Sequence, residues 1–209
     1  MARAPLTTRR LLGLDRSGPP PPETLAGQPL QPWTLPNAIG YARLALLPVF
    51  LVLALGSGDG RVALASVLYA VIGGTDYLDG MLARITGQYS RLGALLDPLV
   101  DRLLVVSGVV VCWHFELLPR WALALLAGRE LVMLVLTQVA LRRGLVDLNV
   151  NMLGRWAVWP TMFSLFLAMV SVTWVAEALL YLGLAMTLGA TAIYMRDGRD
   201  AIRGASTGG

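Results

Sequence analysis

Long apolar stretches, each of about 20 residues, recur along the chain and constrain its fold more than any other feature. A helix of about 20 apolar residues spans the roughly 30 Å hydrocarbon core of a bilayer. Hydrophobic residues make up 56% of the sequence, and charged residues only 14%, against roughly 25% in a soluble domain. The sequence therefore predicts an all-α, polytopic membrane protein.

Six segments are predicted to span the membrane as helices. They run from about 36 to 55, 62 to 85, 92 to 113, 121 to 141, 152 to 172 and 174 to 195. Together they form one predicted six-helix domain over residues 36–195. Residues 1–35 form a polar, Pro-rich tail, in which Leu6–Leu14 could lie on the membrane surface as a short interfacial helix. Residues 196–209 are predicted to be a flexible polar tail.

The distribution of Arg predicts how the helices are oriented. All 17 basic residues are Arg, and most lie in the two tails or follow the second and fourth segments. The opposite side offers only Arg61 and Arg120. By the positive-inside rule, both termini are predicted to be cytoplasmic. The net charge of +4 suits anionic lipid headgroups better than nucleic acid, which is not an expected partner.

Four Asp residues interrupt the second and third segments: Asp76, Asp79, Asp97 and Asp101. Each intramembrane carboxylate costs about 2.5–3.5 kcal/mol on insertion scales, so a bound cation is expected to compensate them. Spacings of three and four residues put each pair on one helix face. The short connection makes the two helices antiparallel neighbours, so the pairs can meet at similar depth. Four hard oxygen ligands favour two Mg²⁺ or Mn²⁺ ions.

Small residues and an Arg accompany these carboxylates. Gly80 and Ala83 leave room for a ligand beside them, and Gly93 does so for a ligand or for close helix packing. Arg84 can form bidentate bonds to a phosphate. This combination is typical of phosphoryl transfer. Two alternatives use the same carboxylates: structural pairs with Arg84 and Arg102, and an intramembrane ion pathway of a transporter.

The stretch from Asp76 to Asp101 resembles the CDP-alcohol phosphotransferase signature, D-x2-D-G-x2-A-R-x8-G-x3-D-x3-D, at all eight fixed positions. The resemblance implies a metal-dependent enzyme of phospholipid biosynthesis that transfers a phosphatidyl group from CDP-diacylglycerol to an alcohol and releases CMP. It implies that the four Asp residues bind the metals and that Asp101 is also the general base. It further implies a homodimer in a bacterial cell membrane, surrounded by lipid, with a cytoplasmic active site.

The same resemblance implies which residues contact CDP-diacylglycerol. Within the signature they are Gly80, Ala83, Arg84, Ser90 and Gly93. A second stretch, Leu35 to Arg43, resembles the first-helix N-x2-T-x2-R of bacterial members, with Gly40 in place of Thr. Asn37, Gly40 and Arg43 are therefore predicted to line the nucleotide end of the site. The alternative for Arg43 is a side chain that snorkels to the membrane interface.

The acceptor alcohol is predicted from two further stretches. Gly128-Arg129-Glu130 resembles the G-R-E of phosphatidylglycerophosphate synthases, so Arg129 is a candidate ligand of an acceptor phosphate; the alternative is an internal pair with Glu130. Arg155 is a second candidate, in a stretch similar to the G-K-x-K-T of glycerophosphate-using members. There apolar residues replace the expected second Lys and the Thr. Glycerol 3-phosphate is the first expectation, phosphatidylglycerol (giving cardiolipin) the second, and inositol phosphate the third.

Overall fold

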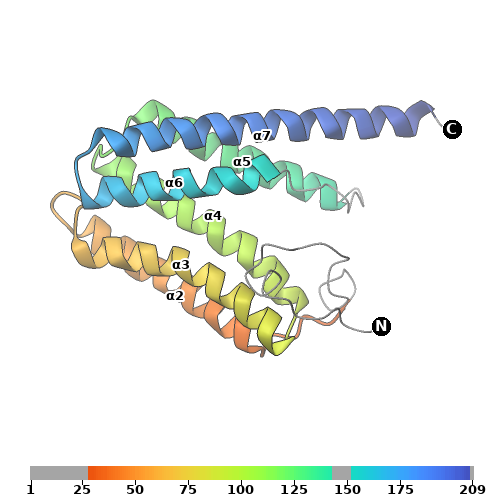
Figure 1. The fold of residues 1–209 in the computed structure, drawn as a ribbon, viewed down its shortest axis with the longest axis horizontal. Helices are drawn as coiled ribbons and strands as arrows, with labels where there is room; N and C mark the ends of the chain where they lie inside the picture. The colour runs from red at the N-terminus through yellow and green to blue at the C-terminus, as the bar shows by residue number, and fades with distance from the viewer. Residues whose placement is uncertain (1–27, 143–151, 208–209) are drawn as a thin grey trace. The chain divides into compact units, whose positions relative to one another are not determined.

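The computed structural model describes residues 28–142 and 152–207. Over these ranges it contains six helices and no strand, so the all-α prediction is confirmed there. Figure 1 labels them α2 (Leu35–Leu55), α3 (Ala63–Thr86), α4 (Arg91–His114), α5 (Arg120–Arg142), α6 (Met152–Val170) and α7 (Trp174–Thr207). The predicted interfacial helix Leu6–Leu14 lies outside the described residues.

The helix boundaries follow the apolar segments closely, with one exception. The first five helices begin and end within two residues of the predicted bounds. Helix α7 continues past Met195 to Thr207, so the predicted end at Met195 is too early, and residues 196–207 are helical rather than a flexible tail. Residues 196–207 contain no Pro, so no residue lacks the backbone N–H that the helix needs, although Gly198 and Gly204 are weak helix formers.

Two of the described helices are long and apolar enough to cross a membrane by length and composition: Leu35–Leu55 and Trp174–Ile193. Helices α3 and α4 contain the charged residues of the signature, which lower their mean hydropathy. The apolar part of α6, Trp156–Val170, is short for a span. The six-span topology therefore stays a prediction.

Local signals mark the start of α2, the end of α3 and the start of α4. Thr34 Oγ1 accepts a hydrogen bond from the backbone N–H of Asn37 at 3.3 Å, as an N-cap residue does. Helix α3 ends before Gly87, whose φ of 64° lies in the left-handed region that Gly adopts readily. Ser90 Oγ accepts from the backbone N–H of Gly93 at 2.9 Å and caps α4. The turn between α3 and α4 is thereby limited to residues 87–90.

The chain divides into two compact units. Among the described residues, the first comprises 28–53 together with Val67–Ser107, that is, most of α2, α3 and α4. Its core contains Phe50, whose ring centroid lies 5.3 Å from that of Tyr69. Helices α3 and α4 approach closely here, because a Cβ on Gly73 would lie only 3.5 Å from Leu104 Cδ2. This unit contains every residue of the predicted signature.

The second unit comprises Ala54–Ser66 and the chain from Gly108 onward, including α5, α6 and α7. Ser164 Oγ of α6 donates a hydrogen bond of 2.7 Å to the carbonyl of Ala176 in α7. Further along, Gly183 faces Thr161, whose backbone N would lie 2.9 Å from a Cβ at position 183. The two helices pack closely because Gly183 has no side chain.

Candidate functional site

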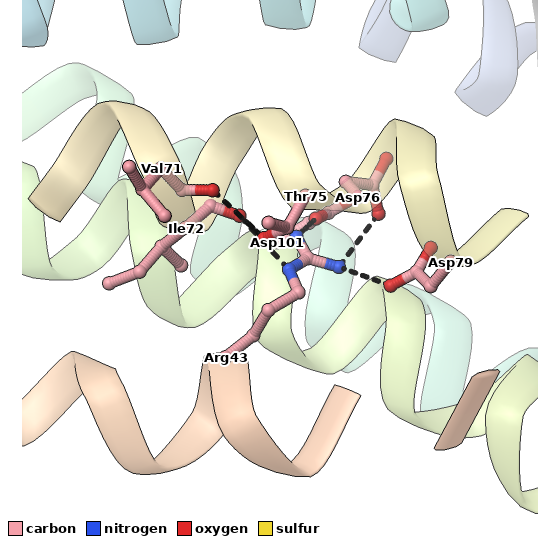
Figure 2. A network of polar contacts seen from close by, with 7 residues as sticks. All are labelled: Arg43, Val71, Ile72, Thr75, Asp76, Asp79 and Asp101. Carbon is pink, nitrogen blue, oxygen red and sulfur yellow. Dashed lines mark hydrogen bonds and ion pairs between the residues drawn. The ribbon is translucent and has the colours of Figure 1, made fainter. Parts of the chain in front are cut away.

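Three of the four signature carboxylates converge on Arg43. Its Nη1 donates to Asp76 Oδ1 at 2.9 Å and to Asp79 Oδ2 at 3.2 Å, and its Nη2 donates to Asp101 Oδ1 at 2.8 Å. Figure 2 shows the guanidinium between the carboxylates, which project from α3 and α4, while Arg43 reaches them from α2. The predicted approach of the two Asp pairs is therefore confirmed for Asp76, Asp79 and Asp101.

The antiparallel course of α3 and α4 produces this convergence. Gly73 faces Leu104. Moving three residues along each helix toward the connecting turn reaches Asp76 on α3 and Asp101 on α4, which share Arg43. Since the side chains at i and i+3 or i+4 lie on one helix face, Asp79 and Asp97 follow on the same faces.

Arg43 is buried although it is charged. Its side chain is only 2% exposed, whereas those of Asp76 and Asp101 are 44% and 38% exposed. Its Nε donates to the backbone carbonyl of Ile72 at 3.0 Å, which ties α2 to α3. A buried guanidinium is tolerated only when its charge is paired and its N–H groups have acceptors, and both conditions hold here. The alternative of a snorkelling interfacial Arg is wrong.

Asp97 differs from the other three carboxylates. It is exposed, and it is close enough to Asp76, Asp79 and Asp101 for their charges to interact with it. Together with Asp79 it lines a pocket of about 170 Å³ in the first unit. Asp97 therefore faces the space that a ligand of this unit would enter.

Most of the predicted donor contacts line the same pocket. Its walls come from the start of α2, the end of α3, the turn and the start of α4. They include Asn37, Gly80, Ala83, Arg84, Ser90 and Gly93. Gly40 is buried in α2, where a Cβ would meet only Leu96 at 3.9 Å. The structure thus brings together six of the eight residues predicted to contact the donor, while Arg43 contacts the carboxylates.

A buried polar contact joins two walls of the pocket. Ser90 Oγ donates to Asn37 Oδ1 at 2.9 Å, and both side chains are nearly inaccessible, at 5% and 2% exposure. Asn37 Nδ2 in turn donates to the carbonyl oxygens of Gln31 and Pro32. A Cβ on Gly93 would lie 2.7 Å from Asn37 Oδ1 and 3.1 Å from Ser90 Oγ. Gly93 therefore makes room for the hydrogen bond between α2 and α4.

Four pocket residues, Pro36, Gln88, Tyr89 and Ala94, were missed by sequence reasoning. Gln88 Oε1 accepts from the backbone N–H of Leu35 at 3.0 Å and so connects the turn with the start of α2. Gln88 and Tyr89 fall in the unspecified x8 part of the signature. Nothing in their spacing could have distinguished them.

The predicted acceptor residues belong to the second unit. Arg129 is 13% exposed and is engaged internally, because Nη1 pairs with Glu130 and Nε donates to Thr191 Oγ1 at 3.2 Å. The alternative of an internal Arg129–Glu130 pair is therefore confirmed. The side chain of Arg155 lies outside the described part of the chain.

The four signature carboxylates are hard oxygen donors of the kind that bind divalent metals. Among the described residues, no group of three or more His, Cys, Asp or Glu side chains has the geometry of a metal site. In the first unit the guanidinium of Arg43 lies where three carboxylate oxygens converge. One guanidinium offsets one of four carboxylate charges, and carboxylate oxygens are the ligands Mg²⁺ and Mn²⁺ prefer. The residues therefore suit such an ion by donor chemistry and charge, whereas their side chains are arranged around Arg43 and not around a metal site.

Comparison with known proteins connects this site to a family. The family model for CDP-alcohol phosphatidyltransferase matches residues 33–189. A cardiolipin synthase (CMP-forming) of Streptomyces coelicolor is 37% identical over 166 residues, 77% of each chain. A CDP-diacylglycerol--glycerol-3-phosphate 3-phosphatidyltransferase of Bacillus subtilis is 31% identical over 63% of this chain and 74% of its own. A probable phosphatidylglycerophosphate synthase of Mycobacterium tuberculosis is 37% identical over 54% of this chain and 55% of its own.

Proposed function

The chain belongs to the CDP-alcohol phosphatidyltransferase family, and from this premise we propose that it transfers a phosphatidyl group from CDP-diacylglycerol to a glycerol-containing alcohol, with release of CMP. The observation that carries the proposal is the convergence of three signature carboxylates beside a pocket lined by the remaining signature residues.

In the proposed reaction the acceptor hydroxyl oxygen attacks the phosphorus that carries the diacylglycerol. A new P–O bond forms, the bond from that phosphorus to the CMP oxygen breaks, and CMP leaves with the electron pair. Asp101 accepts the hydroxyl proton. Its Oδ1 is held by Arg43 Nη2, which leaves Oδ2 for the proton.

The donor pyrophosphate is assigned to the pocket of the first unit. Arg84 lines it and can offer several N–H donors to phosphate oxygens. Gly80 has no side chain, so a phosphate can approach the helix backbone there. The Asn37–Ser90 hydrogen bond keeps α2 and α4 at a fixed separation around the bound nucleotide.

A pair of divalent ions, Mg²⁺ or Mn²⁺, is proposed at Asp76, Asp79, Asp97 and Asp101. When bound, such ions would neutralise negative charge on the pyrophosphate and on the leaving CMP. The hard oxygen donors and the excess negative charge of the cluster support this assignment.

We place phosphatidylglycerol first as the acceptor, which would give cardiolipin. Arg129, the candidate for a free acceptor phosphate, is engaged by Glu130 and Thr191. Ala157 and Val158, which stand where the second Lys and the Thr are expected in glycerophosphate users, are apolar. The cardiolipin synthase of Streptomyces coelicolor also matches more of the chain, at higher identity, than the Bacillus subtilis enzyme.

Glycerol 3-phosphate is the second candidate acceptor. It is supported by the Gly128-Arg129-Glu130 stretch and by similarity to the Bacillus subtilis glycerol-3-phosphate transferase.

A location within a bacterial cell membrane is proposed, with six spans, cytoplasmic termini and active site, and a homodimeric state. Large apolar residues remain exposed at helical spacing along α4: Leu95, Leu99, Leu103, Val106, Val110 and Trp113. From the first to the last of them α4 rises about 27 Å, close to the ~30 Å of a hydrocarbon core. This stripe supports a lipid-facing side on α4 despite its charged residues.

The function is tested with the purified protein, labelled CDP-diacylglycerol, and phosphatidylglycerol, glycerol 3-phosphate or inositol phosphate as acceptor. Mg²⁺-dependent CMP release and a labelled cardiolipin product are expected with phosphatidylglycerol. A labelled phosphatidylglycerophosphate product would support the second candidate instead. Ion flux into liposomes without CMP release would favour a transporter and contradict the proposed reaction.

A further inference from the structure

The proposed reaction leaves the role of Arg43 open, although this residue forms ion pairs with three of the four signature carboxylates. We infer that Arg43 is a positioning residue. It is the protein's own counterion, and it holds Asp76, Asp79 and Asp101 together when no divalent cation is bound. Folding and cation binding would then be coupled through this one side chain. The inference rests on the proposed metal site.

The contacts of Arg43 leave its guanidinium committed to the protein. Each of its three nitrogens donates to an acceptor: Nε to the Ile72 carbonyl, Nη1 to two carboxylates and Nη2 to the third. The side chain is 2% exposed, and it does not line the pocket formed by the other signature residues. Its partners lie on α3 and α4, while Arg43 itself comes from α2.

Electrostatics explains why the metal-free cluster needs this cation. Asp76 and Asp79 lie one helical turn apart, and Asp101 reaches the same guanidinium from the facing helix. Like charges at this separation disfavour one another and would push α3 and α4 apart. Arg43 replaces that repulsion with three charge-assisted hydrogen bonds.

The arrangement also leaves oxygens available for a second cation. Asp76 and Asp79 each use one oxygen for Arg43, so the other oxygen of each carboxylate can bind a cation while Asp101 Oδ2 takes the proton. Asp76 and Asp101 are half-exposed above the buried guanidinium. A bound divalent cation would therefore neutralise part of the carboxylate charge that Arg43 otherwise neutralises alone. Arg43 would then contribute most to the stability of the fold when no divalent cation is bound. By linkage, losing Arg43 should strengthen cation binding.

Two other roles for Arg43 predict different results. If Arg43 mainly contacted the nucleotide, its substitution would raise the KM for CDP-diacylglycerol and leave the stability of the metal-free protein unchanged. If it only braced α2 against α3, its substitution would lower stability equally with and without metal.

The test compares the full-length protein in detergent with the variants Arg43→Gln, Arg43→Lys and, as a matched control, Arg91→Gln. Arg91 belongs to the same unit, and its Nη1 donates to the exposed Gln28 carbonyl rather than to a carboxylate. Thermal unfolding is measured in EDTA and in saturating Mg²⁺, and Mn²⁺ affinity by electron paramagnetic resonance.

Arg43→Gln is expected to lower Tm clearly more in EDTA than in Mg²⁺, and to bind Mn²⁺ about tenfold more tightly or better, as loss of one charge-assisted contact would give. Arg43→Lys keeps the charge and should fall between this variant and the wild type. Arg91→Gln should match the wild type in both measurements.

Equal losses of Tm in EDTA and Mg²⁺, or unchanged or weaker Mn²⁺ binding, would overturn the inference. If Arg43→Gln does not fold in either condition, the same two criteria applied to Arg43→Lys decide. A wild type that binds no Mn²⁺ also overturns it, even if CMP is released. The expected metal and stability results without CMP release would sink only the proposed transferase function.

Discussion

Replacing Gly93 with Ala tests whether the contact between α2 and α4 organises the pocket. The new Cβ would lie 2.7 Å from Asn37 Oδ1, whereas a relaxed C···O contact is about 3.3–3.6 Å. Asn37 therefore has to move by roughly 0.6 Å on this comparison. It cannot do so freely, because its Nδ2 is bound to the carbonyl oxygens of Gln31 and Pro32. The buried hydrogen bond from Ser90 Oγ to Asn37 Oδ1 should break.

Breaking that hydrogen bond leaves a buried polar group unsatisfied, which costs about 1–3 kcal/mol. The higher helix propensity of Ala would offset up to about 1 kcal/mol of this cost. Gly74→Ala is the matched control, since Gly74 lies inside α3 and a Cβ there would meet nothing within 4 Å. Comparing the two variants removes most of the propensity contribution, and Gly93→Ala should be less stable than Gly74→Ala by the cost of the clash.

The difference corresponds to roughly 2–12 °C in Tm for a chain of this size. It is measured by thermal unfolding of both variants in the same detergent. Because Gly93 also lines the pocket, the KM for CDP-diacylglycerol should rise in Gly93→Ala. Equal Tm values for the two variants, with an unchanged KM, would refute the reasoning from the short Cβ distance.

Three further predictions follow from the same structure. Asp101→Asn keeps an oxygen that can accept from Arg43 but removes the base, so CMP release should fall by about 10²-fold or more while donor binding persists; near wild-type turnover would rule out this base. Gly183→Ala should lower Tm relative to Gly74→Ala by an amount equivalent to about 1–3 kcal/mol, because the added Cβ meets backbone atoms of Thr161; equal Tm values would contradict the close packing of α6 on α7. Chelation with EDTA should stop CMP release and added Mg²⁺ or Mn²⁺ should restore it, and activity that survives chelation would argue against the metal site.

The sequence predicted correctly the features that depend on residues close together in the chain, such as helix bounds and the spacing of residues on one helix face. Apolar segments predicted the first five helices to within two residues at each end. The short turn after Thr86 predicted that α3 and α4 run antiparallel. The i,i+3 and i,i+4 spacings then predicted that the Asp pairs would meet, as Arg43 demonstrates by contacting both helices.

Sequence reasoning failed where the structure depends on contacts between residues that are far apart in the sequence. Arg43 lies 58 positions before Asp101, and its place in an apolar helix near the N-terminal tail resembles that of an interfacial Arg. Only packing of α2 against α3 and α4 reveals that it is buried. Gln88 was missed for a related reason, since its partner Leu35 is 53 positions away. The extension of α7 was missed because a polar segment gives no apolar signal.

The signature also makes its four Asp residues look equivalent, whereas the structure distinguishes them by burial and contact. Asp76 and Asp101 are half-exposed and contact Arg43; Asp97 is exposed and lines the pocket. Of the four, Asp79 alone does both: it is 5% exposed, pairs with Arg43 and lines the pocket. A change in the position of Asp79 would therefore alter both its ion pair with Arg43 and the lining of the donor pocket. The linkage between cation binding and donor binding should depend on Asp79 more than on its three neighbours.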